Sequence, residues 1–317
     1  MRYLLPLVRL EESGRILQFC RIRHERTSPL RWRRLQQHQD ERTAELQQVD
    51  TAVFPQITRT ERPGIGVMLG LSLPREVEPV IYATSDLHGY PLDQFQELLK
   101  QASFSDQDFL FVLGDVIDRN GDGGVGLLRW MMEQPNVELI LGNHEAMLLS
   151  CAFLFDEITD ESVAALDEKQ MSLLLNWMDN GSEPTIRALR GLRKKNPEAL
   201  GDLLEYLREA PLYESVSTEK QDFLLVHSGL GGFSPDKKIK EYTADELLWH
   251  RPQPNERYFE DILTVFGHTP TRCYGSADRM FQTETWIDID TGAGYGGAPM
   301  LLCLDDLRAY YAHQEET

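Results

Sequence analysis

The chain has 317 residues, a formal net charge of −19 and an ordinary 41% share of hydrophobic residues. This length suits one large domain or two smaller ones with a sizeable buried core. The acidic balance argues against nucleic-acid binding over a broad face of the core, and no apolar run reaches the roughly 18 residues that cross a bilayer.

The cysteines and the N-terminal sequence bear on the cellular compartment. The spacing of Cys20, Cys151, Cys273 and Cys303 includes no CxxC pair, which favours free thiols in a reducing compartment. The first residues, MRYLLPLVRL, lack the long apolar region and the cleavage site of a signal peptide. We therefore expect a cytoplasmic protein.

Residues 1–76 differ in composition from the rest of the chain. The first 75 residues hold 13 Arg, no Lys and 8 acidic residues, a net charge of +5, so the remainder carries −24. Little regular apolar period is present, which favours a solvated or disordered extension with one helix near Leu35–Val49. Two alternatives stay open, namely a basic arm for an anionic partner such as nucleic acid and a natural translation start near Met68.

From Pro79 onward, apolar runs alternate with amphipathic stretches. The runs PVIYATSD, DFLFVLGD and VELILGN predict three strands. The stretches PLDQFQELLKQA and GGVGLLRWMMEQ, which lie between these strands, predict two helices. This β-α-β-α-β order predicts an α/β fold with a layered core.

The following region is expected to be mostly helical, and strands then return. The helical stretches are EAMLLSCAFLF, DEKQMSLLLNWMDN, EPTIRALRGLRKK and PEALGDLLEYLREA. The later strands are DFLLVHSG, ILTVFGH, TWIDIDTG and MLLCLDD. We therefore expect an N-terminal extension over 1–76 and a main domain over 77–317, with a helical insertion at about 146–210 that forms a cap.

The predicted strands share an unusual feature, because each of five apolar runs stops at side chains able to bind a metal. In an α/β sheet, ligands gather at the carboxyl ends of the strands. Carboxylate, amide and imidazole groups without thiolate suit Mn²⁺ or Fe and also accept Zn²⁺. Any one of these side chains alone is a weak signal, since a single His after a strand is usually an ordinary loop residue. The candidate ligands are Asp86, His88, Asp115, Asn143, His227 and His268.

The order of the motifs is more specific than any one of them. The series D-x-H, G-D-x-x-D-R, G-N-H-E, H-S-G and G-H-T-P resembles the metal-dependent phosphoesterases, specifically the bacterial serine/threonine phosphoprotein phosphatases. The resemblance covers residues 80–305. It implies a metallophosphoesterase β-sandwich flanked by helices, and two divalent cations, with Mn²⁺ expected and Fe or Zn²⁺ as alternatives.

The resemblance also implies how the ligands are shared. One cation would be held by Asp86, His88 and Asp115. The second would be held by Asp115 together with the remaining three candidates, so that Asp115 bridges the pair. A bridging carboxylate offsets the repulsion between two cations roughly 3.5–4 Å apart.

The resemblance assigns the catalytic groups as well. A hydroxide that bridges the metals would attack phosphorus in line, and His144, oriented by Asp118, would protonate the leaving oxygen. Arg119 would bind the phosphoryl oxygens as a bidentate donor. Arg251, in DELLWHRPQ, matches a second phosphate-binding arginine of bacterial members, although a surface Arg explains it equally well. Glu145 is expected to support the site locally at the start of a helix.

The sequence departs from the family pattern in the loops and the cap. Leu141 stands where the family often has Arg, and Asn120 stands where Gly is common. The stretch around Asn180 and Gly181 is expected either to reach the cleft or only to end a helix. Asp288 and Asp290 are weak candidates for extra ligands, because the ligand set is already complete. The Gly-rich TGAGYGG predicts a turn, since no helix follows it.

These features predict a metal-dependent phosphatase that hydrolyses phosphomonoesters, on phosphorylated Ser, Thr or Tyr of a protein or on a small phosphoester. One alternative is a hydrolase of dinucleoside polyphosphates such as diadenosine tetraphosphate, because relatives with the same metal core cleave such anhydrides. Another is an inactive binding module of the same fold, against which the complete ligand set and the His144–Asp118 pair argue. A third makes the arginine-rich extension the functional part.

Overall fold

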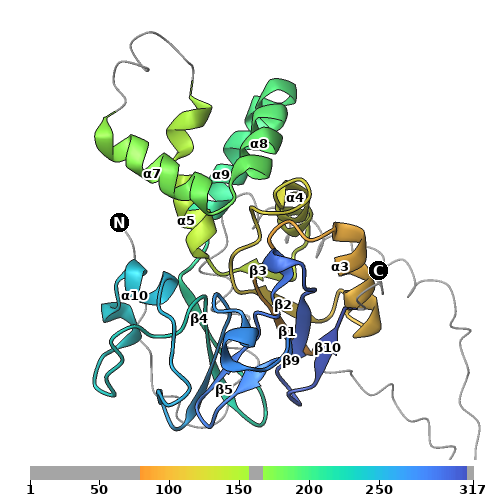
Figure 1. The fold of residues 1–317 in the computed structure, drawn as a ribbon. Helices are drawn as coiled ribbons and strands as arrows, with labels where there is room; N and C mark the ends of the chain where they lie inside the picture. The colour runs from red at the N-terminus through yellow and green to blue at the C-terminus, as the bar shows by residue number, and fades with distance from the viewer. Residues whose placement is uncertain (1–78, 157–166, 313–317) are drawn as a thin grey trace, which may run out of the picture. The chain divides into compact units, whose positions relative to one another are not determined.

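The computed structural model describes residues 79–156 and 167–312 (Figure 1). The extension over 1–76, its expected helix near Leu35–Val49 and the start near Met68 lie outside the described residues. Two five-stranded mixed sheets flanked by helices form the framework, which confirms the predicted α/β class.

The first sheet has the order β10-β9-β1-β2-β3, with a parallel core of three strands. Its bounds are β1 (Ile81–Thr84), β2 (Phe109–Val112), β3 (Val137–Leu139), β9 (Met300–Cys303) and β10 (Ala309–Tyr311). The helices α3 (Leu92–Gln101) and α4 (Val125–Glu133) connect the parallel strands. Because β1, β2 and β3 run in one direction, the loops that follow them all leave the sheet at the carboxyl ends of its strands.

The second sheet has the order β4-β5-β6-β8-β7, and its three central strands are also parallel. Its bounds are β4 (Tyr213–Ser217), β5 (Asp222–Val226), β6 (Ile262–Phe266), β7 (Phe281–Gln282) and β8 (Trp286–Asp288). The short helix α10 (Ala244–Leu248) and the 3-10 turns η2 (Ile239–Glu241), η3 (Thr271–Tyr274) and η4 (Ala293–Tyr295) lie in its connections.

The helices that follow β3 and precede β4 in the chain sit together at the top of Figure 1. Their bounds are α5 (Asn143–Ser150), η1 (Ala152–Phe155), α7 (Glu168–Asp179), α8 (Glu183–Lys195) and α9 (Pro197–Glu209). Leu203 and Leu207 of α9 and Trp177 of α7 belong to the same buried cluster as Leu110 of β2. We refer to α7, α8 and α9 as the helical block, and this block shares the core of the first sheet.

One boundary differs from the prediction in a way that affects the site. The apolar run before Asn143 was expected to be strand throughout, but β3 ends at Leu139. Asn143 and His144 instead open α5, which begins after Gly142. A helix start therefore places these two side chains.

Within the described ranges, no helix is both long and apolar enough to span a bilayer. Cys151, Cys273 and Cys303 are free thiols, as the sequence predicts.

Candidate metal centre

The structure brings all six candidate ligands together. They lie in the loops after β1, β2, β5 and β6 and at the start of α5, and each of them is buried. Segments up to 182 residues apart meet here, since the His268 N–H donates to Oδ2 of Asp86 at 2.8 Å. The two sheets therefore contribute jointly to one site.

His88 shows how the first half of the site is arranged. Its Nδ1 lies 2.9 Å from the carbonyl oxygen of Ile117, which can only accept a hydrogen bond, so Nδ1 carries the proton. The unprotonated Nε2 then faces Oδ2 of Asp115 at 3.7 Å and Oδ1 of Asp86 at 3.9 Å. Three acceptors that point toward one another fit a cation placed among them.

His227 and His268 form the second half. Nδ1 of His227 donates to the carbonyl of Leu113 at 2.7 Å, which leaves Nε2 2.8 Å from Oδ1 of Asn143. This Nε2 also lies 3.4 Å from Oδ1 of Asp115. Nε2 of His268 is buried without a hydrogen-bond partner, and the ligand atoms of Asp115, His227 and His268 lie within 4.8 Å of one another. The donor set therefore fits a second cation.

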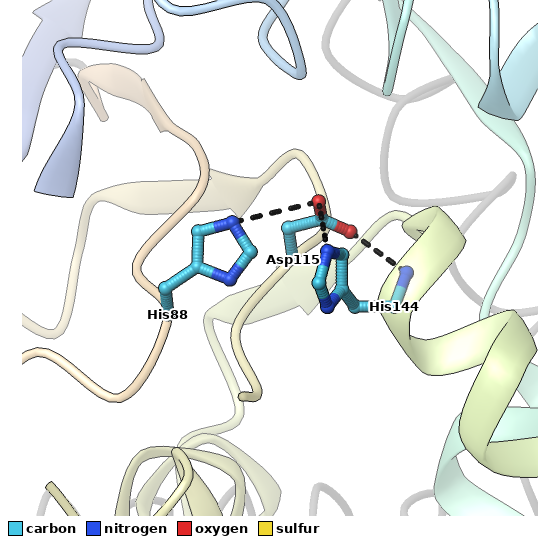
Figure 2. A group of neighbouring side chains, drawn as sticks. All are labelled: His88, Asp115 and His144. Carbon is cyan, nitrogen blue, oxygen red and sulfur yellow. Dashed lines mark hydrogen bonds and ion pairs between the residues drawn. The ribbon is translucent and has the colours of Figure 1, made fainter. Parts of the chain in front are cut away.

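Asp115 stands between the two halves. Its Oδ2 faces His88 and its Oδ1 faces His227, as a bridging carboxylate would. Oδ1 also accepts the backbone N–H of His144 at 3.0 Å. Figure 2 shows His88 and His144 flanking this carboxylate.

The electrostatics of the cluster favour cation binding. Burial, followed by the charge of Asp290, raises the pKa of Asp86, and burial, followed by Asp86, raises that of Asp115. Burial lowers the pKa of His227 to about 3 and also lowers the pKa of His88 and His268. The imidazoles are thus already neutral near pH 7, and a bound cation would stabilise the carboxylate form of both Asp residues.

Glu145 fixes the loop that carries Asp115. Its Oε2 accepts the backbone N–H of Asp115 at 2.8 Å and of Gly142 at 3.1 Å. Its Oε1 accepts those of Val116 at 2.9 Å and Ile117 at 3.2 Å. The expected local support is therefore a buried carboxylate that joins the start of α5 to the loop after β2.

Several of these residues adopt a backbone conformation that L-residues rarely take. They are Asp86, His88, Asp115, Asp118, Arg119 and His268, each with φ between 42° and 77°. Such strain concentrates at functional sites and persists only where the surroundings hold it. Gly142 shows how closely the loops approach, because a Cβ there would lie 2.3 Å from the Asp115 nitrogen.

His144 and Asp118 form the predicted pair. Nδ1 of His144 lies 2.6 Å from Oδ2 of Asp118, and both side chains are buried. Nε2 of His144 lies 3.8 Å from Oδ2 of Asp115, so this ring also belongs to a group that could hold a metal, with His88 and Asp115. The bond to Asp118 turns the ring so that Nε2 faces the site.

Two residues of the helical block contact Asp118, and both lie in the stretch NWMDNGSEPT around Asn180 and Gly181, which was expected either to reach the cleft or only to end a helix. Nε1 of Trp177 donates to Oδ2 at 2.8 Å, and the hydroxyl of Thr185 donates to Oδ1 at 2.6 Å. They lie 59 and 67 residues after Asp118, so no local pattern connects them with it.

Arg119 lies beside His144 and under an aromatic ring. Its Nη2 donates to Nε2 of His144 at 3.2 Å, and its Cζ lies 4.3 Å from the ring centre of Tyr295, which is 55% exposed. The Arg119 N–H donates to the carbonyl of Gly181 at 2.9 Å. Gly181 therefore both follows α7 and reaches the loop of the site.

Arg251 lies against the His268 loop. Its side chain is exposed, and Nη1 donates to the carbonyl of His268 at 3.3 Å and to the Thr269 hydroxyl at 3.4 Å. It is therefore close to the second half of the site.

Asp288 and Asp290 are buried beside the first half. Oδ1 of Asp288 accepts the N–H of Asp290 at 2.9 Å, and Oδ1 of Asp290 accepts the N–H of Gly292 at 2.9 Å. Burial raises the pKa of Asp290 to about 6. These bonds account for one oxygen of each carboxylate within the turn that follows β8.

Residues 79–309 match the family described as calcineurin-like phosphoesterase. A protein of Chromobacterium violaceum named bis(5'-nucleosyl)-tetraphosphatase, symmetrical, is 35% identical over 273 residues, which cover 73% of this chain and 94% of the relative. Proteins of the same name from Vibrio cholerae and Acidovorax sp. are 29% and 28% identical. The Vibrio match covers 71% of this chain and 95% of the relative, and the Acidovorax match covers 60% and 57%.

The fold is also found among solved structures. A crystal structure provisionally named as a diadenosine tetraphosphatase superposes with a TM-score of 0.50 at 17% identity, over 76% of this chain and 96% of the other. The match supports the same α/β architecture. The relatives carry a different name from the protein phosphatases that the motifs first suggest.

Proposed function

Because the chain belongs to the calcineurin-like phosphoesterase family, we propose that it is a metal-dependent hydrolase that cleaves a phosphoanhydride bond of dinucleoside polyphosphates. The observation that carries this proposal is the Chromobacterium relative, which is 35% identical and matched over nearly its whole length. The expectation of a protein phosphatase is thereby revised in favour of its alternative. Within the proposed assignment, residues 77–317 form the catalytic domain.

The metal roles follow the donor geometry. Asp86, His88 and Asp115 would hold one cation, and Asp115 with Asn143, His227 and His268 would hold the other, with Mn²⁺ proposed and Fe or Zn²⁺ as alternatives. When bound, such cations lower the pKa of a water toward ~7 and neutralise phosphoryl charge. The orphaned Nε2 of His268 and the paired acceptors around Asp115 support this arrangement.

The remaining side chains would bind the substrate and move a proton. Arg119 would exchange its bond with His144 for the phosphoryl oxygens, which frees Nε2 of His144 to carry a proton to the leaving oxygen. Arg251, which lies against the His268 loop, would bind charge near the second half of the site. The exposed ring of Tyr295 beside Arg119 supports a substrate with an aromatic base near the phosphates.

One observation favours a second function, the hydrolysis of phosphomonoesters. A leaving alkoxide needs a proton, whereas a leaving phosphate oxygen with a pKa near ~6 needs one far less. The buried His144–Asp118 pair is therefore suited to Ser, Thr or Tyr phosphate as well.

The experiment compares kcat/KM on diadenosine tetraphosphate and on a phosphoserine peptide, after chelation and separate return of Mn²⁺, Zn²⁺ or Mg²⁺. We expect the dinucleotide to be preferred by at least ~10-fold, which corresponds to 1.4 kcal/mol of transition-state binding. A preference for the peptide would contradict the proposal and support the phosphatase. Failure of every metal to restore either activity would support the inactive module.

A further inference from the structure

The carboxylate of Asp118 is held on both oxygens by the helical block. Oδ2 receives the indole N–H of Trp177 at 2.8 Å, next to Nδ1 of His144 at 2.6 Å. Oδ1 receives the hydroxyl of Thr185 at 2.6 Å. All four side chains are at most 1% exposed, so water does not replace any of these bonds. The plane of the carboxylate is thus fixed by donors that come from α7 and α8.

Thr185 also holds the backbone of Asp118. Its Oγ1 accepts the Asp118 N–H at 3.0 Å, while Asp118 itself has a φ of 77°. A non-glycine residue keeps this conformation only where its surroundings hold it. Gly123 permits the contact, since a Cβ there would lie 2.3 Å from the Thr185 nitrogen. Thr185 therefore fixes Asp118 at two points.

Ordinary core packing does not account for this arrangement. Burial of an indole needs one acceptor for its N–H, and any backbone carbonyl would serve, as Glu256 does for Trp286. Trp177 instead shares the oxygen that His144 uses. A buried polar group that loses its hydrogen-bond partner costs free energy. The Asp118 carboxylate and its three side-chain donors therefore hold one arrangement.

We propose that Trp177 and Thr185 are positioning residues that act through Asp118 on His144. The helical block is then part of the proton-transfer apparatus, in addition to its place over the core. This inference rests on one part of the proposed function, the role of His144 as the group that protonates the leaving oxygen.

The experiment uses the full chain with metal bound and measures kcat and KM for two aryl phosphates. Phenyl phosphate has a poor leaving group, and p-nitrophenyl phosphate has a good one. General acid catalysis contributes roughly 10²–10⁴-fold, so partial loss in Trp177→Phe and Thr185→Val should lower kcat on phenyl phosphate by ~10-fold or more. On p-nitrophenyl phosphate we expect kcat to fall by at most ~2-fold. KM and the metal content per chain should stay close to those of the wild type.

Matched controls separate this role from general loss of packing. Thr185→Ser keeps the hydroxyl and should restore kcat on phenyl phosphate. Thr264→Val removes a buried hydroxyl that has no hydrogen-bond partner, and Trp286→Phe removes an indole N–H bonded elsewhere. Neither control should change the ratio of the two rates.

His144→Ala separates the two levels of the proposal. If His144→Ala lowers kcat equally on phenyl phosphate and on p-nitrophenyl phosphate, the acid role fails and the inference fails with it. If His144→Ala loses more on phenyl phosphate, but Trp177→Phe and Thr185→Val lose both activities equally or keep both, only the inference is overturned. A Thr185→Ser variant as impaired as Thr185→Val would also overturn it.

Discussion

The loops after the parallel strands carry their own functional groups, whereas the helical block supports a group that belongs to another segment. Asp86 and His88 follow β1 within four residues, and His227 directly follows β5. Trp177 and Thr185, in contrast, reach Asp118 only through the folded chain. The difference teaches that the candidate ligands of this site are a local property of strand ends, while the orientation of its proposed proton donor is a tertiary property.

The largest expected effect comes from the strand-end loops. Asp115→Asn leaves a neutral amide between two groups of acceptors, so both cations should be weakened. Loss of a residue that only hydrogen-bonds to a metal ligand already lowers metal affinity or activity by roughly 10–100-fold. For Asp115→Asn we therefore expect activity to fall by more than ~100-fold, with a lower metal content by elemental analysis. Asp288→Asn is the matched control and should keep its metal. Equal loss of metal in both variants would instead make Asp288 a ligand.

His144→Ala tests whether the two regions serve different steps. It should keep the metals and lose ~10²–10⁴-fold of kcat on phosphoserine peptide, since the leaving alkoxide then departs without a proton. On diadenosine tetraphosphate the loss should be much smaller, because the leaving phosphate oxygen has a pKa near ~6. Steady-state kinetics on both substrates gives the ratio. Loss of metal together with activity would show that this ring is a ligand.

Glu145→Gln tests how the strand-end loop keeps its shape. The new amide NH₂ would face two of the four backbone N–H groups that the carboxylate now accepts. Loss of hydrogen bonds to a buried charged group should lower the free energy of unfolding by ~2–3 kcal/mol, measured by urea denaturation. Glu133→Gln, at an exposed position near the end of α4, should leave it within ~0.5 kcal/mol. An unchanged midpoint for Glu145→Gln would contradict the role of this carboxylate.

The smallest expected effect is the pH dependence of metal stabilisation. The pKa values of Asp86 and Asp115 are raised, so these groups hold protons in mildly acidic solution that a cation must displace. The pKa values of the His ligands are lowered, so they are already neutral and do not compete. The rise in Tm on adding Mn²⁺ should therefore be larger at about pH 8 than at about pH 5.5, by ~3 °C or more. A larger rise at the lower pH would contradict this sign.

Most of the fold and the grouping of the candidate ligands could be predicted from the sequence, and particular residues show why. Apolar runs that stop at Asp or His place those residues at strand ends, and parallel strands bring the ends together. The edge strands β4 and β10 escaped prediction because they are only partly buried and have little apolar pattern. Tyr295 was read as part of a plain turn, and its ring over Arg119 depends on a loop that arrives from the far end of the chain.

The left-handed backbone at six of the site residues has a practical consequence for mutagenesis. Alanine at Asp86, Asp118 or His268 would remove a functional group and also introduce a residue that tolerates this conformation poorly. Asparagine visits it more readily, and glycine does so freely. An alanine scan would therefore merge chemical and conformational losses into one number, whereas paired Asn and Gly replacements at each position would keep them apart.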